Sequence, residues 1–296
     1  MSLVVNHNLM AGNIANSLNS HYGRLATSTE RLSTGLRINS SADDAAGLAI
    51  RELMRSDIAT MQQGVRNAND AISLIQTADG ALGVIDEKLI RMKELAEQAA
   101  TGTYDSTQRL MIESEYQQMA SEITRIANAT DFNGIHLLNG NLSSNTHDGS
   151  DLTAQGKMKI HFGTANDSAE DYYYIQIGSA TASSFGVGNE AASTAKAFTV
   201  STQEAAQRAL VGLTEAIVSK DKIRAHIGAM QNRLENTITN LTTQAENLQA
   251  AESRISDVDV ATEMTNFVRN QILTQSAVAM LSQANSLPQM AMQLIG

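Results

Sequence analysis

The chain has 296 residues, with 21 Lys and Arg against 31 Asp and Glu, and so carries a formal net charge of −10. It contains no Cys, no Trp and a single proline, Pro288. Without Cys, a disulfide framework, a thiolate nucleophile and a Cys-ligated zinc site are all excluded. The acidic balance argues against non-specific binding to nucleic acid or anionic lipid, since both require basic patches. The scarcity of proline permits very long helices.

Both ends of the chain are uncharged. Residues 1–23 and residues 270–296 contain no Asp, Glu, Lys or Arg. The first segment lacks the basic region of a cleavable signal peptide, so we expect neither a Sec nor a Tat signal. Neither segment reaches about 18 consecutive apolar residues, so we expect no membrane insertion. Two ordinary core helices would account for such ends. We favour a pair of assembly segments, because uncharged faces can pack against each other and then against neighbouring molecules.

A long helical pattern follows these N-terminal residues. From Ile58 to Met92, apolar residues recur mainly in steps of three and four, which is typical of a coiled-coil helix. A second helical pattern covers Tyr104 to Ala129 and ends at turn-forming residues within 130–134. The apolar residues of the first pattern form one stripe along the helix: Ile58, Met61, Val65, Ala68, Ile72, Ile75, Leu82, Ile85, Leu89 and Met92.

The periodicity changes from helical to alternating in the middle of the chain. Residues 158–162 alternate between apolar and polar side chains, and residues 171–178 form a second strand-like run. Together they predict a β-hairpin. The flanking stretches, 139–149 and 180–195, are rich in Ser, Thr, Asn and Gly, and we interpret them as surface loops.

Helical signals return at Ser201 or Thr202, either of which can cap a helix, and continue to Ala251. A further helical pattern begins at Val260 and runs into the uncharged C-terminus. The predicted fold is therefore mainly α with a small β insertion. Because the chain goes out and returns, we expect its N- and C-terminal helices to pair.

No catalytic or metal-binding constellation is evident. The six histidines are scattered, without metal-ligand spacing. Asp43 and Asp44 are adjacent, and adjacent helical residues do not face each other, so we interpret them as charges that favour a helix N-terminus. Gly186, Gly188 and Ala191 fit a loose dinucleotide fingerprint but lack its βαβ context. We predict no enzyme activity and no cofactor.

The two ends of the chain resemble bacterial flagellin. Residues 28–50 (STERLSTGLRINSSADDAAGLAI) resemble the family's N-terminal signature, and residues 246–295, from ENLQAAESRI to MLSQANSLPQMAMQLI, resemble its C-terminal one. The resemblance covers nearly the whole chain except about residues 140–200. Shorter matches are LIRMKEL at 89–95, ITRIANATDFNGIHLL at 123–138 and AHIGAMQNRLENTITNL at 225–241.

This resemblance implies a domain organisation. Residues 1–42 and 255–296 would form a terminal coiled-coil assembly domain that lines an inner tube. Residues 43–254 would form a helical core domain, with its β-hairpin region at about 135–200. The large outer domains of many flagellins are missing. The implied assembly seam consists of Leu9, Ile14, Leu18, Leu25, Leu32, Met264, Phe267, Ile272, Leu281, Leu287 and Leu294.

The resemblance also implies a function. The chain would be exported unfolded through the flagellar type III apparatus and would polymerise outside the cell into the filament used for motility. Its partners would be further copies of itself, an export chaperone, a cap protein and hook-junction proteins. In flagellins recognised by Toll-like receptor 5, central contacts come from LxRxxEL and from a Glu on the next helix. These map onto Arg91, Leu95 and Glu115, with Gln98 and Ile112 alongside.

The sequence is also compatible with two other functions. A hook–filament junction protein has similar terminal helices, although its central region usually matches flagellin less well. A long helical signalling module would also explain the heptads, but it predicts a stable soluble dimer and leaves both uncharged ends unexplained.

Overall fold

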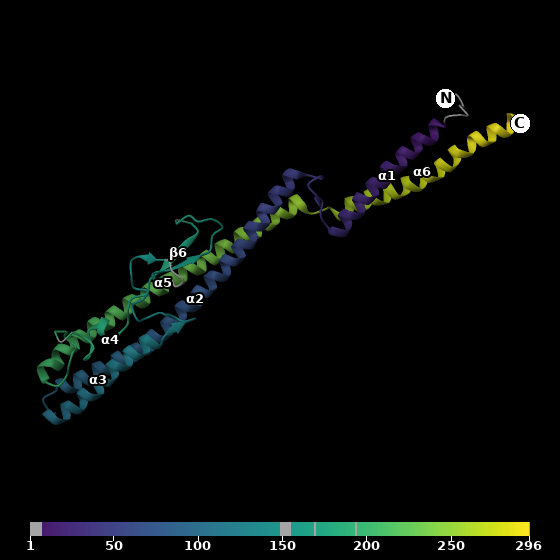
Figure 1. Cartoon of the computed structure of the whole chain (residues 1–296). Helices are drawn as coiled ribbons and strands as arrows, with labels where there is room; N and C mark the ends of the chain where they lie inside the picture. The colour runs from purple at the N-terminus through teal and green to yellow at the C-terminus, as the bar shows by residue number, and fades with distance from the viewer. Residues whose placement is uncertain (1–7, 149–154, 169, 193, 296) are drawn as a thin grey trace. The chain divides into compact units, whose positions relative to one another are not determined.

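The computed structural model describes residues 8–148, 155–168, 170–192 and 194–295, and the side chains of all of these except 155, 287–289 and 291–295. Long helices dominate, and short antiparallel strand pairs lie between the third and fifth helices (Figure 1). The fold is thus mainly α with a small β insertion, as predicted. The elements are α1 (Leu9–Thr34), α2 (Ala45–Ala100), α3 (Ser106–Ala129), β1 (Asp131–Phe132), β2 (Ile135–His136), β3 (His147–Asp148), β4 (Gln155–Gly156), β5 (Met158–His161), β6 (Tyr172–Ile175), α4 (Ala182–Phe185), α5 (Gln203–Ser256) and α6 (Val260–Ile295).

The chain forms two compact units. The terminal unit comprises Met1–Ile58 and Glu246–Gly296, and the central unit comprises Ala59–Ala245. Both divisions fall within helices, α2 and α5 respectively. The domain boundaries expected from the sequence, after 42 and before 255, fall near the ends of those helices and stay a prediction.

The core of the central unit is built on α2. The predicted stripe is confirmed, and its members from Ala68 to Met92 are buried except for Ile72, which is half-buried. Ion pairs add to the apolar contacts between α2 and α5. The ammonium of Lys220, whose side chain is 2% exposed, lies 2.6 Å from a carboxylate oxygen of Asp86. Burial by itself lowers the pKa of Lys220, but hydrogen bonds to Asp221 and Asp86 outweigh it and raise the pKa.

Both ends of α3 follow from local sequence. Asp105 and Gln108 form a reciprocal capping box at its N-terminus, with side chain-to-backbone distances of 2.8 and 3.1 Å. After the C-cap residue Thr130, β1 and β2 pair across Asn133 and Gly134, whose φ angles are +52° and +79°. Two consecutive residues with positive φ are what a tight two-residue hairpin turn requires. The predicted turn is therefore confirmed.

The predicted β-hairpin is formed by β5 and β6. Its register pairs Met158 with Ile175 and His161 with Tyr172. Thr202 accepts a hydrogen bond from the backbone N–H of Ala205 and caps α5, as one of the two predicted cap residues.

The loop after β5 approaches α2 closely at a glycine. A Cβ added at Gly64 would lie 2.0 Å from the carbonyl oxygen of Phe162, so only glycine fits there without displacing backbone. One turn further along α2, the Asn67 side-chain amide donates a 2.8 Å hydrogen bond to the carbonyl of His161. These contacts attach the hairpin to the helical core.

The interpretation of residues 180–195 as a surface loop was wrong. This segment contains the short helix α4, and Ala182, Phe185 and Val187 are buried in the core. Its small residues allow this packing, since a Cβ at Gly188 would meet the Cβ of Ala120 at 2.3 Å. In the other predicted loop, 139–149, Leu142 is buried; position 149 lies outside the described residues.

A pair of glycine substitutions in α2 tests this packing. Gly64→Ala should destabilise the protein by about 1–3 kcal/mol, because the new methyl group overpacks against fixed backbone. Gly80→Ala is the matched control: its Cβ meets nothing within 4 Å, so helix propensity should stabilise the protein by about 0.5–1 kcal/mol. Thermal unfolding followed by circular dichroism measures both effects. Equal shifts in the two variants would contradict the close approach.

Candidate functional site

The terminal helices α1 and α6 lie side by side and run antiparallel (Figure 1). The predicted pairing is confirmed. Asn8 ties the two helices together at the start of α1. Its side-chain oxygen accepts a hydrogen bond from the backbone N–H of Ala11, and its amide donates one of 2.8 Å to the carbonyl of Ala284.

The buried positions of each helix follow coiled-coil spacing. On both helices, the half-buried or buried residues that recur in alternating steps of three and four form one seam. Several of these positions are polar, which is unusual because the residues that face the partner helix in a coiled coil are mostly apolar. The seam residues are Ala11, Ile14, Leu18, His21, Leu25, Ser28 and Leu32 on α1, and Glu263, Phe267, Asn270, Thr274, Ala277, Leu281 and Ala284 on α6.

A short polar contact across the seam joins Ser28 and Glu263. The Ser28 hydroxyl, in a residue 4% exposed, donates a 2.5 Å hydrogen bond to a carboxylate oxygen of Glu263. The Glu263 side chain is 11% exposed, and its second oxygen lies 4.0 Å from the guanidinium of Arg31. A mostly buried carboxylate is costly unless partnered, so these contacts fix the register of the helices.

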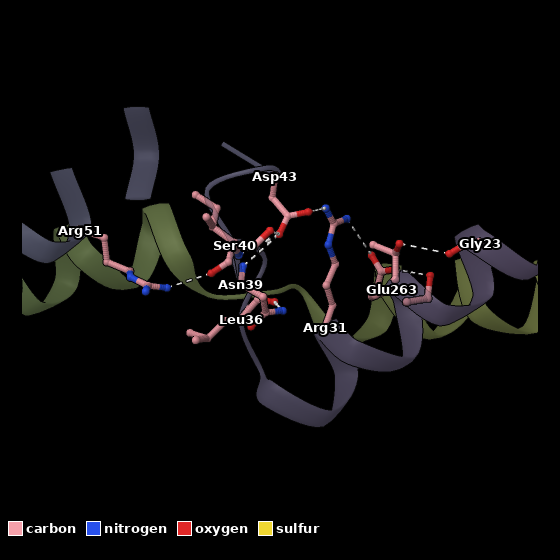
Figure 2. Close-up of polar contacts among 11 residues, drawn as sticks. Gly23, Arg31, Leu36, Asn39, Ser40, Asp43, Arg51 and Glu263 are labelled. Atoms are coloured by element: carbon pink, nitrogen blue, oxygen red, sulfur yellow. Dashed lines mark hydrogen bonds and ion pairs between the residues drawn. The ribbon is translucent and has the colours of Figure 1, made fainter. Parts of the chain in front are cut away.

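Arg31 continues this network into the link between α1 and α2. Figure 2 shows its guanidinium between Glu263 and Asp43, whose carboxylate lies 4.0 Å from it. Asp43 also accepts hydrogen bonds from the backbone N–H groups of Ser40, at 3.0 Å, and Asn39, at 3.2 Å. These backbone hydrogen bonds, Ser40 first, lower the pKa of Asp43. Asp43 therefore holds the link in shape as an ionised group.

The links before α2 and after α5 are joined by backbone pairing. Leu36 and Asp257 form an isolated antiparallel bridge, flanked by hydrogen bonds from Arg37 N–H to the Ser256 carbonyl and from Val258 N–H to the Gly35 carbonyl. The sequence predicts that Asp43 and Asp44 lie at a helix N-terminus. Asp44 does lie there, directly before α2, and its carboxylate accepts a 2.9 Å hydrogen bond from the Gly47 N–H.

Arg51 secures the same link from the first turns of α2. Its guanidinium, in a residue 8% exposed, donates a 2.8 Å hydrogen bond to the carbonyl of Ile38, whose side chain is buried (Figure 2). The sequence did not single out Arg51, because a lone Arg near a helix start carries no distinctive pattern.

Away from the seam, the terminal helices expose many large apolar side chains. Val260, Met264, Val268 and Ile272 follow one another at four-residue intervals and so form a stripe along α6. Large exposed apolar patches mark interaction surfaces. The exposed residues are Leu9, Met10, Tyr22, Val260, Met264, Val268, Ile272, Leu273, Val278, Met280 and Met290.

The structure distributes nine of the eleven predicted assembly residues over these two surfaces. Leu9, Met264 and Ile272 are exposed, because they fall outside the alternating spacing of the seam. The side chains of Leu287 and Leu294 lie outside the described residues. The remaining six, Ile14, Leu18, Leu25, Leu32, Phe267 and Leu281, occupy seam positions.

The predicted receptor residues lie in the central unit, where α2 meets α3. The guanidinium of Arg91 donates two hydrogen bonds to Glu115, at 3.0 and 2.8 Å, and one of 3.0 Å to Glu94. Hydrogen bonds to Glu115 and then Glu94 raise the pKa of Arg91. The Arg91 and Glu115 side chains are 48% and 43% exposed, so the pair is accessible.

The other three receptor residues have different environments. Leu95 and Ile112 are buried, at 1% and 8% exposure, and belong to the core beneath the surface pair. Gln98 is exposed, donates a 3.1 Å hydrogen bond to the Tyr104 hydroxyl, and lines a surface hollow of about 640 Å³. The structure thus leaves Arg91, Glu115 and Gln98 as the accessible members.

Among the described side chains, no group of three or more His, Asp or Glu is arranged to hold a metal ion. Along the same parts of the chain, no helix has both the length and the apolar content that crossing a bilayer requires.

Comparison with known proteins identifies the family. A model described as the bacterial flagellin N-terminal helical region matches residues 5–143, and one described as the bacterial flagellin C-terminal helical region matches residues 210–295. The chain belongs to the bacterial flagellin family. The flagellin of Bacillus subtilis (strain 168) is 40% identical over 307 residues, covering 98% of this chain and 99% of the relative.

A second relative has a comparable length. The flagellar filament 33 kDa core protein of Treponema phagedenis is 40% identical over 296 residues, covering 99% of this chain and all of the relative. At the level of fold alone, a putative flagellar hook-associated protein from Vibrio parahaemolyticus is similar, with 14% identity and a TM-score of 0.55 over 73% of this chain and all of the other. This flagellin is therefore a short form without large outer domains.

Removing the Ser28 hydroxyl should loosen the terminal pair. Ser28→Ala leaves the mostly buried Glu263 carboxylate without its closest donor, at a cost of about 1–3 kcal/mol. Amide hydrogen exchange along α1 should accelerate accordingly. Ser33→Ala, at an exposed position of the same helix, is the control and should leave exchange unchanged. Unaltered exchange in Ser28→Ala would show that the contact does not hold the pair together.

Proposed function

We propose that this chain is the structural subunit of a bacterial flagellar filament and that it polymerises through its paired terminal helices. The observation that carries the proposal is the α1–α6 pair, which joins a partly polar seam to extensive exposed apolar surface. A single copy leaves that surface in water. Neighbouring copies would bury it, and the released water provides the driving force for assembly.

The family supports this proposal. Flagellins are structural proteins, and one full-length relative is itself named a flagellar filament core protein. The proposal includes export of the unfolded chain through the flagellar type III apparatus, with an export chaperone, a cap protein and hook-junction proteins as partners. It places the assembled filament outside the cell.

Two alternatives are less well supported. A hook–filament junction protein shares the fold, but the likeness to a hook-associated structure is 14% in sequence, against 40% over full length to flagellins. A signalling module that forms a discrete dimer would bury its apolar residues in one interface, whereas here many large apolar side chains are exposed outside the α1–α6 seam.

A charge placed in the seam should abolish polymerisation. In Leu18→Asp a carboxylate without a partner would occupy a half-buried seam position and be driven out of the α1–α6 contact, so seeded monomer should form no filaments. Asn19→Asp adds the same charge at an exposed neighbouring position and should still polymerise. Sedimentation and negative-stain electron microscopy after addition of filament seeds measure the outcome. Filaments from Leu18→Asp would overturn the seam assignment, and failure of both variants would attribute the loss to charge alone.

We further propose that monomers are recognised by Toll-like receptor 5 through the exposed Arg91–Glu115 pair, with Gln98 beside it. An exposed guanidinium offers a planar, bidentate donor set to a receptor carboxylate or carbonyl. Because Arg91 already binds Glu115 and Glu94, the receptor must share or replace those contacts. Leu95 and Ile112 would support this surface from below.

Receptor signalling should therefore depend on Arg91. Arg91→Ala should weaken signalling about tenfold or more, as expected for loss of a charged interface anchor, in cells that express Toll-like receptor 5 and a reporter. Arg125→Ala, which removes an exposed Arg paired with Glu122 on α3, is the matched control and should signal normally. Leu95→Ala is unsuitable for this purpose, since it would create a core cavity. Normal signalling by Arg91→Ala would contradict the proposal that the Arg91–Glu115 pair contacts the receptor.

A further inference from the structure

One face of the β5–β6 hairpin gathers cations and aromatic rings. Successive strand residues point to opposite faces, and the register pairs Lys159 with Tyr174 and His161 with Tyr172. The alternate residues, among them Met158, Ile160, Tyr173 and Ile175, pack against the helical core. We call the outward group the hairpin patch, which consists of His147, Lys157, Lys159, His161, Tyr172 and Tyr174.

The members of the patch are in contact with each other. The Lys159 ammonium lies 3.6 Å from the centre of the Tyr172 ring, and that of Lys157 lies 4.5 Å from the centre of the Tyr174 ring. The two Tyr rings are edge to face at 5.4 Å. Such cation–π and aromatic contacts order the side chains before any ligand arrives, which reduces the entropic cost of binding.

The histidines extend the patch at both ends. The His161 ring stacks on Tyr172 with centroids 6.0 Å apart, and the His147 ring lies 5.4 Å from Tyr174. A ring nitrogen of His147 is hydrogen-bonded to the carbonyl of Lys157 at 2.8 Å, which holds the imidazole against the hairpin. All six patch residues are half-buried, so parts of their rings and ammonium groups face solvent.

The charge of the patch contrasts with that of the chain. Neither β5 nor β6 contains an Asp or Glu, although the whole chain carries a net charge of −10. The residue directly before β6, Asp171, is buried and accepts a 2.6 Å hydrogen bond from the backbone N–H of Asp167. Exposed acidic residues close in sequence, Asp148, Asp167 and Glu170, lie outside β5 and β6. A basic, aromatic surface on an acidic protein attracts an anion to one defined place.

We propose that the hairpin patch binds an acidic polysaccharide. The solvent-facing parts of the Tyr172 and Tyr174 rings would contact the C–H groups of sugar rings, and Lys157 and Lys159 would pair with carboxylate or sulfate groups along the polymer. The patch is short, since four strand residues span about 13 Å. It therefore suits a polymer with charges spaced along successive sugars, of which only a few need to be neutralised.

Nucleic acid fits less well. Duplex DNA carries about one negative charge per 1.7 Å of helix axis, so an acidic protein with one short basic patch would repel most of its length. A second copy of this chain is also acidic, and a contact between subunits would use the patch differently. Binding of DNA and a change in polymerisation alone are therefore the two results that would contradict the proposal.

The experiment measures binding of purified monomer to polygalacturonate and to heparin, with neutral dextran and a single-stranded DNA oligomer as comparisons, over a range of salt concentrations. The double variant Lys157→Gln/Lys159→Gln should bind the acidic polymers about five- to tenfold more weakly and show a shallower dependence on salt. Tyr174→Leu should weaken binding without changing the salt dependence, because it removes a ring and no charge. Lys222→Gln, at an exposed position of α5, is the control and should bind normally.

Cross-strand Lys–Tyr contacts also stabilise a two-stranded ribbon, so thermal unfolding is measured for every variant. Lys157→Arg/Lys159→Arg keeps both charges and should retain binding even where the Gln variant unfolds earlier. The proposal is overturned by wild-type monomer that binds neither acidic polymer, by preferential binding of DNA, or by Gln and Arg variants that behave alike. It is also overturned if the Gln variant alters only seeded polymerisation, which would assign the patch to a subunit contact. Because binding is measured on monomer, its outcome is independent of whether the chain forms filaments.

Discussion

The mostly buried carboxylate of Glu263 is the constraint on which the terminal unit depends. Sliding α1 against α6 by one turn would separate this carboxylate from Ser28 and Arg31 and leave it in the seam without a partner. Such a displacement is expensive, whereas the contact itself contributes little net stability over a well-packed apolar pair. Polar seam residues therefore specify the register of the helices more than they strengthen their association.

The seam combines apolar residues such as Leu18 and Phe267 with polar ones, and it does not take up all the large apolar side chains of the two helices. Val260, Met264, Val268 and Ile272 remain on the outside of α6. In the proposed filament, the seam would set the register within one chain, and the outer face of α6 would attract neighbouring chains.

The sequence predicted elements best where apolar spacing and burial coincide, as in α2 between Ala68 and Met92. It was less informative for α6, because the seam passes through Asn270 and Thr274 while large apolar residues face outward. A search for three-and-four spacing through polar residues would have found that seam. The buried segment at 180–195 was misread because small residues serve close packing as well as loops. The pairing of Arg91 with Glu115 depends on how α2 and α3 pack, which no local pattern encodes.

The contacts that join α1 to α6 also connect the most distant parts of the polypeptide. Asn8 and Ala284 are 276 positions apart, and Ser28 and Glu263 are 235 apart. Closing so large a loop is entropically costly unless the intervening chain has already become compact. The central unit, with its more local contacts, is accordingly expected to fold first, and the helix pair last. A chain that still lacks its C-terminal residues cannot form the α1–α6 pair. The pair and its exposed apolar surface therefore appear only when the whole polypeptide is present.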